Sequence, residues 1–312
     1  MKNLLLVNAS PHMRGRDTTQ GVMRDVLIAL LPTLVAAVYL FGLRALLLCG
    51  VCVAACMLFE YLYRRLLQLP NTVSDLSAAV TGLLLALGLP VGLPLWMAVI
   101  GCFAAIVIVK QLFGGIGKNF ANPAVVGRMV LFISFATPMT VLPLPFTSGV
   151  DAVSSATPLA ALAASPAAAA QFDYMQLFLG TIGGSIGETC KVTLLLGFVY
   201  LLVRRIITPT ATLAFAGSAV LFSFLMGQDP LYHLLSGSLI FGAVFMATDY
   251  TTTPTTEWGK AIFGLGCGIV TMVIRSFASY PEGISFAILL MNIATPLIDR
   301  VTETRAFGGV KS

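Results

Sequence analysis

The sequence predicts an all-α integral membrane protein. Of its 312 residues, 58% are hydrophobic and 10% are charged, whereas about 25% of a soluble domain is charged. The apolar residues gather in runs of about 20, the length that crosses a bilayer. The basic residues stand singly or in pairs, without the basic stripe typical of nucleic-acid binding. We therefore expect membrane lipid, and not nucleic acid, to surround this chain.

The apolar runs predict about ten transmembrane helices. A shorter Gly-rich piece at 174–187 is expected to be re-entrant or interfacial, because it is too brief to cross. The ten predicted spans are 25–42, 45–63, 75–90, 94–112, 124–142, 190–203, 207–226, 231–248, 259–275 and 282–299.

The basic residues predict the orientation of these spans. With the N-terminus in the cytoplasm, 15 of the 18 Lys and Arg residues fall in cytoplasmic segments, Lys110 and Arg128 among them. Only Arg44, Lys191 and Arg275 fall on the opposite side, as the positive-inside rule favours. The prediction is a cytoplasmic segment 1–24, one polytopic membrane domain 25–299 and a cytoplasmic tail 300–312. Within that domain, the loop 143–173 lies on the outer face.

The polar N-terminal segment argues against a cleavable signal peptide, so the first span would serve as an uncleaved signal. The cysteines Cys49, Cys52 and Cys56 have a spacing that could suggest an iron–sulfur cluster. No fourth thiolate accompanies them, and small cysteines commonly pack between membrane helices, so packing is favoured.

Two glycine clusters interrupt the apolar pattern. Gly114-Gly115-Ile-Gly117 precedes the fifth predicted span, and Gly183-Gly184-Ser-Ile-Gly187 precedes the sixth. Paired interruptions of this kind are typical of broken helices in repeated membrane folds, whose exposed helix ends can bind ligands. Close packing of helices through glycine explains them equally well.

Carboxylates near the ends of spans are candidate functional residues, because charge within lipid is costly. Solvation at the membrane surface is the favoured interpretation for Glu257, Glu282 and Asp299. Asp249 differs because it lies in the hydroxyl-rich string Thr248-Asp249-Tyr-Thr-Thr-Thr. That string predicts either a site for a cation or a cofactor's polar edge, or a helix end that satisfies its own backbone. The full set is Asp75, Glu188, Asp249, Glu257, Glu282 and Asp299.

The tripeptide Ala-Thr-Pro occurs around Thr137, Thr157 and Thr295. At Thr137 and Thr295 it follows apolar helix, where a residue before proline predicts a helix boundary. Only Thr157 follows an acidic and hydroxyl-rich stretch, Asp151-Ala-Val-Ser154-Ser155-Ala156, in a segment without Lys or Arg. Local pattern alone indicates a turn that leads into a helix beginning at Pro158.

These motifs carry a resemblance to a known family. The stretch Asp151 to Thr157 resembles the target of flavin transferases, which join FMN through its phosphate to a threonine. Further motifs stand in order along the chain and resemble the NqrB/RnfD family, particularly the D subunits of Rnf ion-translocating complexes. Two positions depart from the family pattern: Ser155 stands where glycine is common, and Tyr250 where proline is common. The further motifs are Ser10-Pro11-His12, Leu112 to Gly127, Gly183 to Thr189, Phe245 to Asp249 and Tyr280 to Asn292.

The resemblance implies a fold of two inverted repeats with broken or re-entrant helices, similar to urea transporters. It also implies FMN held by a phosphoester at Thr157, with Asp151, Ser154, Ser155 and Ala156 as the attachment motif. Glu188 and Asp249 would be further cofactor-binding residues, and a second, non-covalent flavin remains open.

The implied activity is one relay in an inner-membrane complex that couples electron transfer between ferredoxin and NAD to sodium or proton transport. The implied partners are the other Rnf subunits and a flavin transferase acting on the outer face. Two alternatives remain open from the residues alone: a small-solute transporter or channel without a redox cofactor, and a structural membrane anchor.

Overall fold

The computed structural model describes residues 18–146, 157–165, 172–278 and 282–303, and these residues form helices joined by loops, without a β-strand. The attachment-motif residues Asp151, Ser154, Ser155 and Ala156 lie outside the described residues. Five of the six cysteines are buried and all are free thiols, in agreement with a packing role.

Among the described residues, four helices are long and apolar enough to cross a membrane: α1 (Thr19–Phe41), α2 (Leu43–Leu66), α14 (Glu257–Phe277) and α15 (Ile284–Thr302). Helix α1 begins six residues before the predicted span because Thr18 caps it, its Oγ1 accepting from Gly21 N at 3.1 Å. An N-cap hydroxyl of this kind satisfies a backbone N–H that has no partner within the helix.

Five further predicted spans correspond to shorter apolar helices of 10–17 residues among the described residues. They are α3 (Ser77–Leu87), α4 (Leu95–Phe103) continued by the π-helix η2 (Ala104–Gln111), α5 (Pro123–Ser134), α10 (Lys191–Val203) and α11 (Pro209–Leu225). A 3₁₀ turn, η1 (Val73–Asp75), precedes α3. The single predicted span 124–142 is wrong as a continuous helix, because the backbone of Phe135 (φ −133°, ψ 55°) separates α5 from α6 (Ala136–Thr140).

The predicted span 231–248 is also interrupted. It divides into α12 (Pro230–Leu235), α13 (Leu239–Phe241) and the π-helix η3 (Gly242–Met246), and Gly237 between them has φ +63°. The predicted re-entrant piece 174–187 contains α9 (Tyr174–Leu179), which ends at Gly180 and leads into a buried irregular segment. Non-helical backbone at such depth is tolerated where protein surrounds it.

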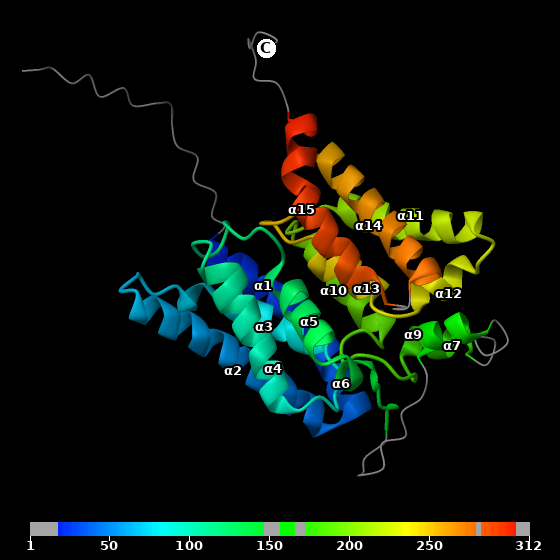
Figure 1. Ribbon diagram of the computed structural model, residues 1–312, viewed down its shortest axis with the longest axis horizontal. Coiled ribbons are helices and arrows are strands. Elements are labelled where there is room, and N and C mark those ends of the chain that lie inside the picture. The colour runs from blue at the N-terminus through cyan, green and yellow to red at the C-terminus, as the bar shows by residue number, and fades with distance from the viewer. Residues whose placement is uncertain (1–17, 147–156, 166–171, 279–281, 304–312) are drawn as a thin grey trace, which may run out of the picture.

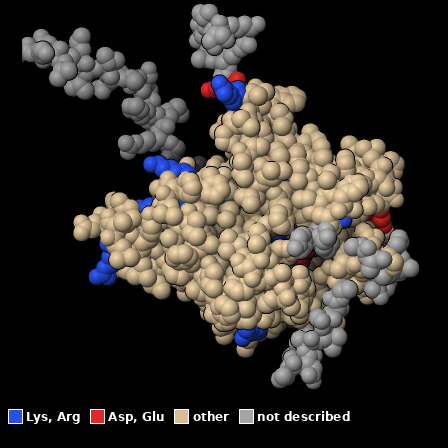
Figure 2. Space-filling view, viewed as in Figure 1, with Lys and Arg blue, Asp and Glu red and all other residues tan. Residues whose placement is uncertain are grey.

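The helices of the two halves of the chain lie side by side (Figure 1). Helix α1 packs against α10, and α5 packs against α15, so each contact joins an early helix to a late one. Fully buried side chains such as Leu85 and Phe241 fill the core between them. The face in Figure 2 carries few charged side chains, which suits a surface in contact with lipid.

One of the helix boundaries predicted at threonines is wrong. Thr295 does not end a helix, because α15 continues through Pro296, as membrane helices can. The Thr295 hydroxyl bonds to Met291 O at 3.0 Å and to Thr252 O at 2.9 Å. The boundary predicted at Thr137 is confirmed within a few residues, because α5 ends at Ser134 and α6 begins at Ala136.

Lys110 and Arg128, assigned above to cytoplasmic segments, are buried within the helical body. Each has buried partners that a sequence count of charges does not reveal.

Candidate functional site: a buried charged cluster beside Thr157

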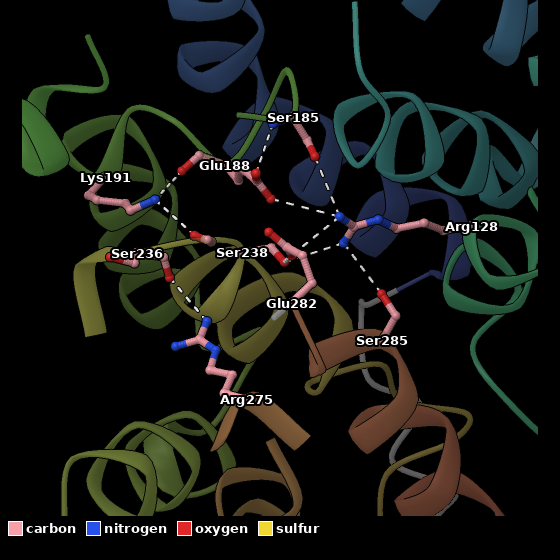
Figure 3. Close-up of polar contacts among 10 residues, drawn as sticks. Arg128, Ser185, Glu188, Lys191, Ser236, Ser238, Arg275, Glu282 and Ser285 are labelled. Atoms are coloured by element: carbon pink, nitrogen blue, oxygen red, sulfur yellow. Dashed lines mark hydrogen bonds and ion pairs between the residues drawn. The ribbon is translucent and has the colours of Figure 1, made fainter. Parts of the chain in front are cut away.

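The buried charged cluster consists of Arg128, Glu188, Lys191, Arg275 and Glu282 (Figure 3). Arg128 comes from the middle of α5, Lys191 from the start of α10 and Arg275 from the end of α14. Glu188 and Glu282 lie in the segments that precede α10 and α15. The interruptions of the helices thus bring together five charged side chains from four separate segments of the chain.

Arg128 is the centre of the cluster. Its guanidinium donates to the hydroxyls of Ser238 and Ser285 at 3.3 Å and to that of Ser185 at 3.4 Å. One of its nitrogens lies 3.4 Å from Glu282 Oε2 and 3.8 Å from Glu188 Oε2.

The two carboxylates of the cluster are held differently. Glu188 Oε1 accepts from the backbone N of Ser185 at 2.8 Å, while its Oε2 is buried without a hydrogen-bond donor. Glu282 Oε2 accepts from Ser238 at 2.8 Å, and its side chain retains 25% exposure. Glu282 therefore faces open space, and Glu188 faces protein.

The two remaining cations donate hydrogen bonds to the backbone where helices are interrupted. Lys191 Nζ donates to the carbonyl oxygens of Glu188 and Gly237, the latter at 3.0 Å. Arg275 donates to the carbonyl oxygens of His233 at 2.6 Å and Ser236 at 3.1 Å. The carbonyls of His233, Ser236 and Gly237 lie where α12 ends, so the basic side chains replace the helical donors that the interruption removes.

Thr157 lies on the wall of a cavity of about 250 Å³ beside this cluster. Arg128, Ser185, Glu282 and Ser285 line one part of the cavity, and Met129, Phe132 and Phe286 contribute apolar surface. The Thr157 hydroxyl accepts from Ala160 N at 3.1 Å and caps α7 (Pro158–Ala164), as the local pattern predicted. Helix α7 is held by Tyr232, whose hydroxyl donates to Pro158 O at 2.8 Å.

The predicted site residues fall into two places. Thr157 and Glu188 share a second, smaller pocket lined also by Lys191 and Glu282. Asp249 instead lies between two other cavities of about 80 and 380 Å³, the first of which Lys110, Asn119 and Asn122 also line. Its Oδ2 accepts from Thr251 at 3.1 Å and Thr252 at 3.3 Å.

The two glycine clusters, which the sequence pairs, have different structural roles. Gly114, Gly115 and Gly117 all have positive φ, which glycine adopts at little cost. Gly187 has an ordinary φ, but a Cβ there would lie 2.6 Å from Leu87 Cβ. The first cluster therefore bends the chain, and the second allows close packing.

Sequence reasoning missed Arg128 and dismissed Glu282 as a solvated end residue. A lone arginine within the apolar string Val126-Gly-Arg128-Met-Val was the signal for the first. Glu282 gave no such signal, because only the fold shows that Arg128 lies opposite. The solvated interpretation fits Glu257, which is exposed and bonds to the partly buried Lys260, and Asp299, which bonds to the exposed Thr255.

Within the described residues, no group of three His, Cys, Asp or Glu side chains is arranged to hold a metal ion. The fold and the cluster together define a polytopic helical membrane protein with a charged site at the interruptions of its helices.

The chain belongs to the NQR2, RnfD, RnfE family, whose profile matches residues 6–308. It is 45% identical over 310 residues to the D subunit of the Na⁺-translocating ferredoxin:NAD⁺ oxidoreductase complex of Acetobacterium woodii, covering 98% of this chain and 96% of that relative.

Two further relatives have similar coverage. The D subunit of the proton-translocating ferredoxin:NAD⁺ oxidoreductase complex of Clostridium ljungdahlii is 39% identical, over 98% of this chain and 97% of the relative. The D subunit of the ion-translocating oxidoreductase complex of Stutzerimonas stutzeri is 40% identical, over 94% and 93%.

Proposed function

We propose that this chain is the D subunit of an Rnf-type complex that couples electron transfer between ferredoxin and NAD to sodium or proton transport. Within that complex it relays electrons through FMN joined by a phosphoester to Thr157. The observation that carries the proposal is similarity along nearly the whole chain to subunits of complexes with that activity. The chain acts as one part of the complex and is not catalytic alone.

The residues around Thr157 fit a flavin. A flat aromatic ring system with one polar edge needs apolar walls and a few directed polar groups. Phe132, Phe286 and Met129 supply such walls, and Arg128 with Ser285 supplies polar groups in the same cavity. Bound FMN would supply the redox chemistry, while these residues orient it and exclude water.

Thr157 itself is compatible with attachment. Its Oγ1 accepts from Ala160 N, and an ester oxygen retains a lone pair for that contact. The residue is half-buried at the start of α7 and lines the cavity. Attachment therefore requires no loss of the helix cap.

In this proposal the protein lies in the inner membrane with both termini in the cytoplasm and residues 143–173 on the outer face. A flavin transferase then reaches Thr157 from outside, and the other Rnf subunits pass electrons to and from the flavin. The absence of Lys and Arg between Val141 and Lys191 supports this orientation.

Asp249 is proposed as a second functional residue, in ion coupling or in binding a non-covalent flavin. It lies between two cavities and is surrounded by threonine hydroxyls, and these oxygens suit a hard cation or a polar cofactor edge. Glu188 has the further proposed role of holding the segment that borders Thr157.

The attachment is tested by in-gel flavin fluorescence of the denatured protein in Thr157 variants. Thr157→Asn retains a side-chain acceptor for the helix cap but has no hydroxyl, so it should abolish the fluorescent band without unfolding α7. Thr157→Ser retains both and should keep the band if the transferase accepts serine. Thr137→Ala and Thr295→Ala should also keep it.

A fluorescent band that persists in Thr157→Asn and Thr157→Ala would assign the flavin to another residue. A wild-type protein without any band would instead favour the small-solute transporter or the structural anchor. The anchor alone predicts fluorescence from partner subunits only, so the same gel separates these alternatives.

A further inference from the structure

Arg128 is buried and makes only long contacts with the described residues around it. Its Nη1 and Nη2 atoms donate to three serine hydroxyls at 3.3–3.4 Å and to Glu282 at 3.4 Å, and Glu188 lies 3.8 Å away. Hydrogen bonds between guanidinium and carboxylate are usually about 2.7–2.9 Å long. An anionic acceptor in the adjoining space would therefore compete well with the neutral serine hydroxyls for this guanidinium.

The cluster also has an excess of positive charge. Among the described residues, the three cations Arg128, Lys191 and Arg275 face the two carboxylates Glu188 and Glu282 (Figure 3). Lys191 and Arg275 donate to backbone carbonyls, whereas Arg128 lies against both carboxylates and is the one of these three cations that lines the cavity beside Thr157. An uncompensated buried charge is costly, and an anionic group in the adjoining space would lower that cost.

The cavity gives Arg128 access to such a group. Arg128 and Thr157 line the same cavity, and apolar side chains, including Phe132 and Phe286, line it with them. These two rings pack edge to face, with their centroids 6.2 Å apart. A ligand attached at Thr157 would therefore lay its ring along the aromatic wall and present a polar edge to Arg128.

We propose that Arg128 binds the pyrimidine edge of the flavin at Thr157, where N1 and the C2 carbonyl carry the negative charge of the reduced ring. This assignment rests on the proposed function. Arg128 keeps its proton and acts through charge and hydrogen bonding, with Ser238, Ser285 and Glu282 holding its guanidinium in place. The contact favours the reduced flavin over the oxidised one, because only the reduced ring carries that charge.

The test compares Arg128→Gln with Arg128→Lys in the purified complex. Gln keeps hydrogen-bonding capacity but removes the charge, whereas Lys keeps the charge but loses the planar fork. Two quantities are measured: the in-gel fluorescent band of this protein, and the midpoint potential of its flavin by spectroelectrochemical titration at fixed pH. Ser285→Ala is the matched control, since it removes a neutral partner of Arg128 and no charge.

Arg128→Gln should retain the band and lower the midpoint potential, so that the ratio of reduced to oxidised flavin at a set potential falls at least about tenfold. Arg128→Lys should lower the midpoint potential less than Arg128→Gln does, and Ser285→Ala should lower it least. A retained band with an unchanged potential in Arg128→Gln overturns the inference, as expected if Arg128 contacts only the phosphate or the protein. If Arg128→Gln does not assemble, a negative shift in Arg128→Lys supports the contact and no shift overturns it.

The two proposals fail in different ways. A missing band in the wild type overturns the attachment at Thr157 and this inference with it. A wild-type band combined with an unchanged potential in the Arg128 variants overturns only the role of Arg128.

Discussion

Lys110 and Arg128 show how differently a membrane protein can bury a cation. Lys110 Nζ donates to Glu60 Oε2 at 2.7 Å and to Ser77 Oγ at 2.5 Å, and both ionic side chains are almost fully buried. Among the described residues, Arg128 has no partner closer than 3.3 Å. The short pair of Lys110 and Glu60 is enclosed by protein, whereas the longer contacts of Arg128 border the cavity beside Thr157.

Asp249 has features of a residue that ends a helix and of a residue in a binding site. Its backbone oxygen accepts from Thr253 N at 3.1 Å, as a helix-ending turn requires, yet it also borders two cavities. Asp249→Asn preserves shape and removes the charge. We expect it to leave assembly and the Thr157 fluorescence intact and to reduce electron transfer or ion uptake, measured in inverted membrane vesicles.

Asp299→Asn is the control for Asp249, because Asp299 is a carboxylate that accepts from Thr255 N at 3.0 Å near the end of α15. Its replacement should leave both activities unchanged. Normal electron transfer and ion uptake in Asp249→Asn would show that Asp249 has only a structural role, in the turn that it forms with its threonines.

At the scale of elements, the interruptions of helices are held by specific side chains. Asn122 caps α5, its Oδ1 accepting from Ala124 N at 3.0 Å and Val125 N at 3.3 Å. Its Nδ2 donates to Met246 O at 3.3 Å, where η3 ends. A single amide thus joins the start of one interrupted helix to the end of another.

Asn122→Ala should lower the free energy of unfolding by about 1–2 kcal/mol, because it removes the cap and leaves the Met246 carbonyl without its donor. Asn122→Ser restores a capping oxygen and should recover part of that loss. Thermal unfolding of the purified proteins in detergent measures the order of stability, which should be wild type, then Asn122→Ser, then Asn122→Ala. Equal stabilities for Asn122→Ala and the wild type would contradict this role for the amide.

At the scale of the whole molecule, the cluster draws residues from both halves of the chain. Arg128 lies on α5, while Glu188, Arg275 and Glu282 come from later segments, and the packing of α5 against α15 brings them together. Neither half alone contains the cluster. The integrity of the site therefore depends on the contact between the halves, and not on any one helix.

The proposed orientation predicts that residues 150 and 205 face opposite sides of the membrane. Val150→Cys and Arg205→Cys, each in a background where the partly exposed Cys190 is replaced by Ala, are labelled in intact cells with a membrane-impermeant thiol reagent. We expect labelling at 150 and none at 205 until the membrane is opened. Labelling of both positions from outside would refute the orientation and the access of the transferase to Thr157.

Much of the architecture follows from composition and periodicity. Long apolar runs predicted α1, α2, α14 and α15 within a few residues at most ends, since a helix that meets lipid must be apolar along its length. Motif order was sufficient to indicate the family, because motifs record residue identity directly. The helix start at Pro158 could also be predicted, because threonine before proline is a local capping signal.

Only the tertiary structure decided which interior residues meet. Phe135 at the break packs against Trp96, Thr295 before Pro296 bonds to Thr252 O, and Arg128 bonds to Glu282, so each of these features has a neighbour far away in sequence. The sequence around a carboxylate such as Glu282 gives the same signal whether the side chain faces water or an arginine 154 residues away. The sequence by itself determined a helical membrane protein of this family, because apolarity and motifs are local properties. The charged cluster beside Thr157 was decided by packing, because its members come from four separate segments that only the folded chain brings together.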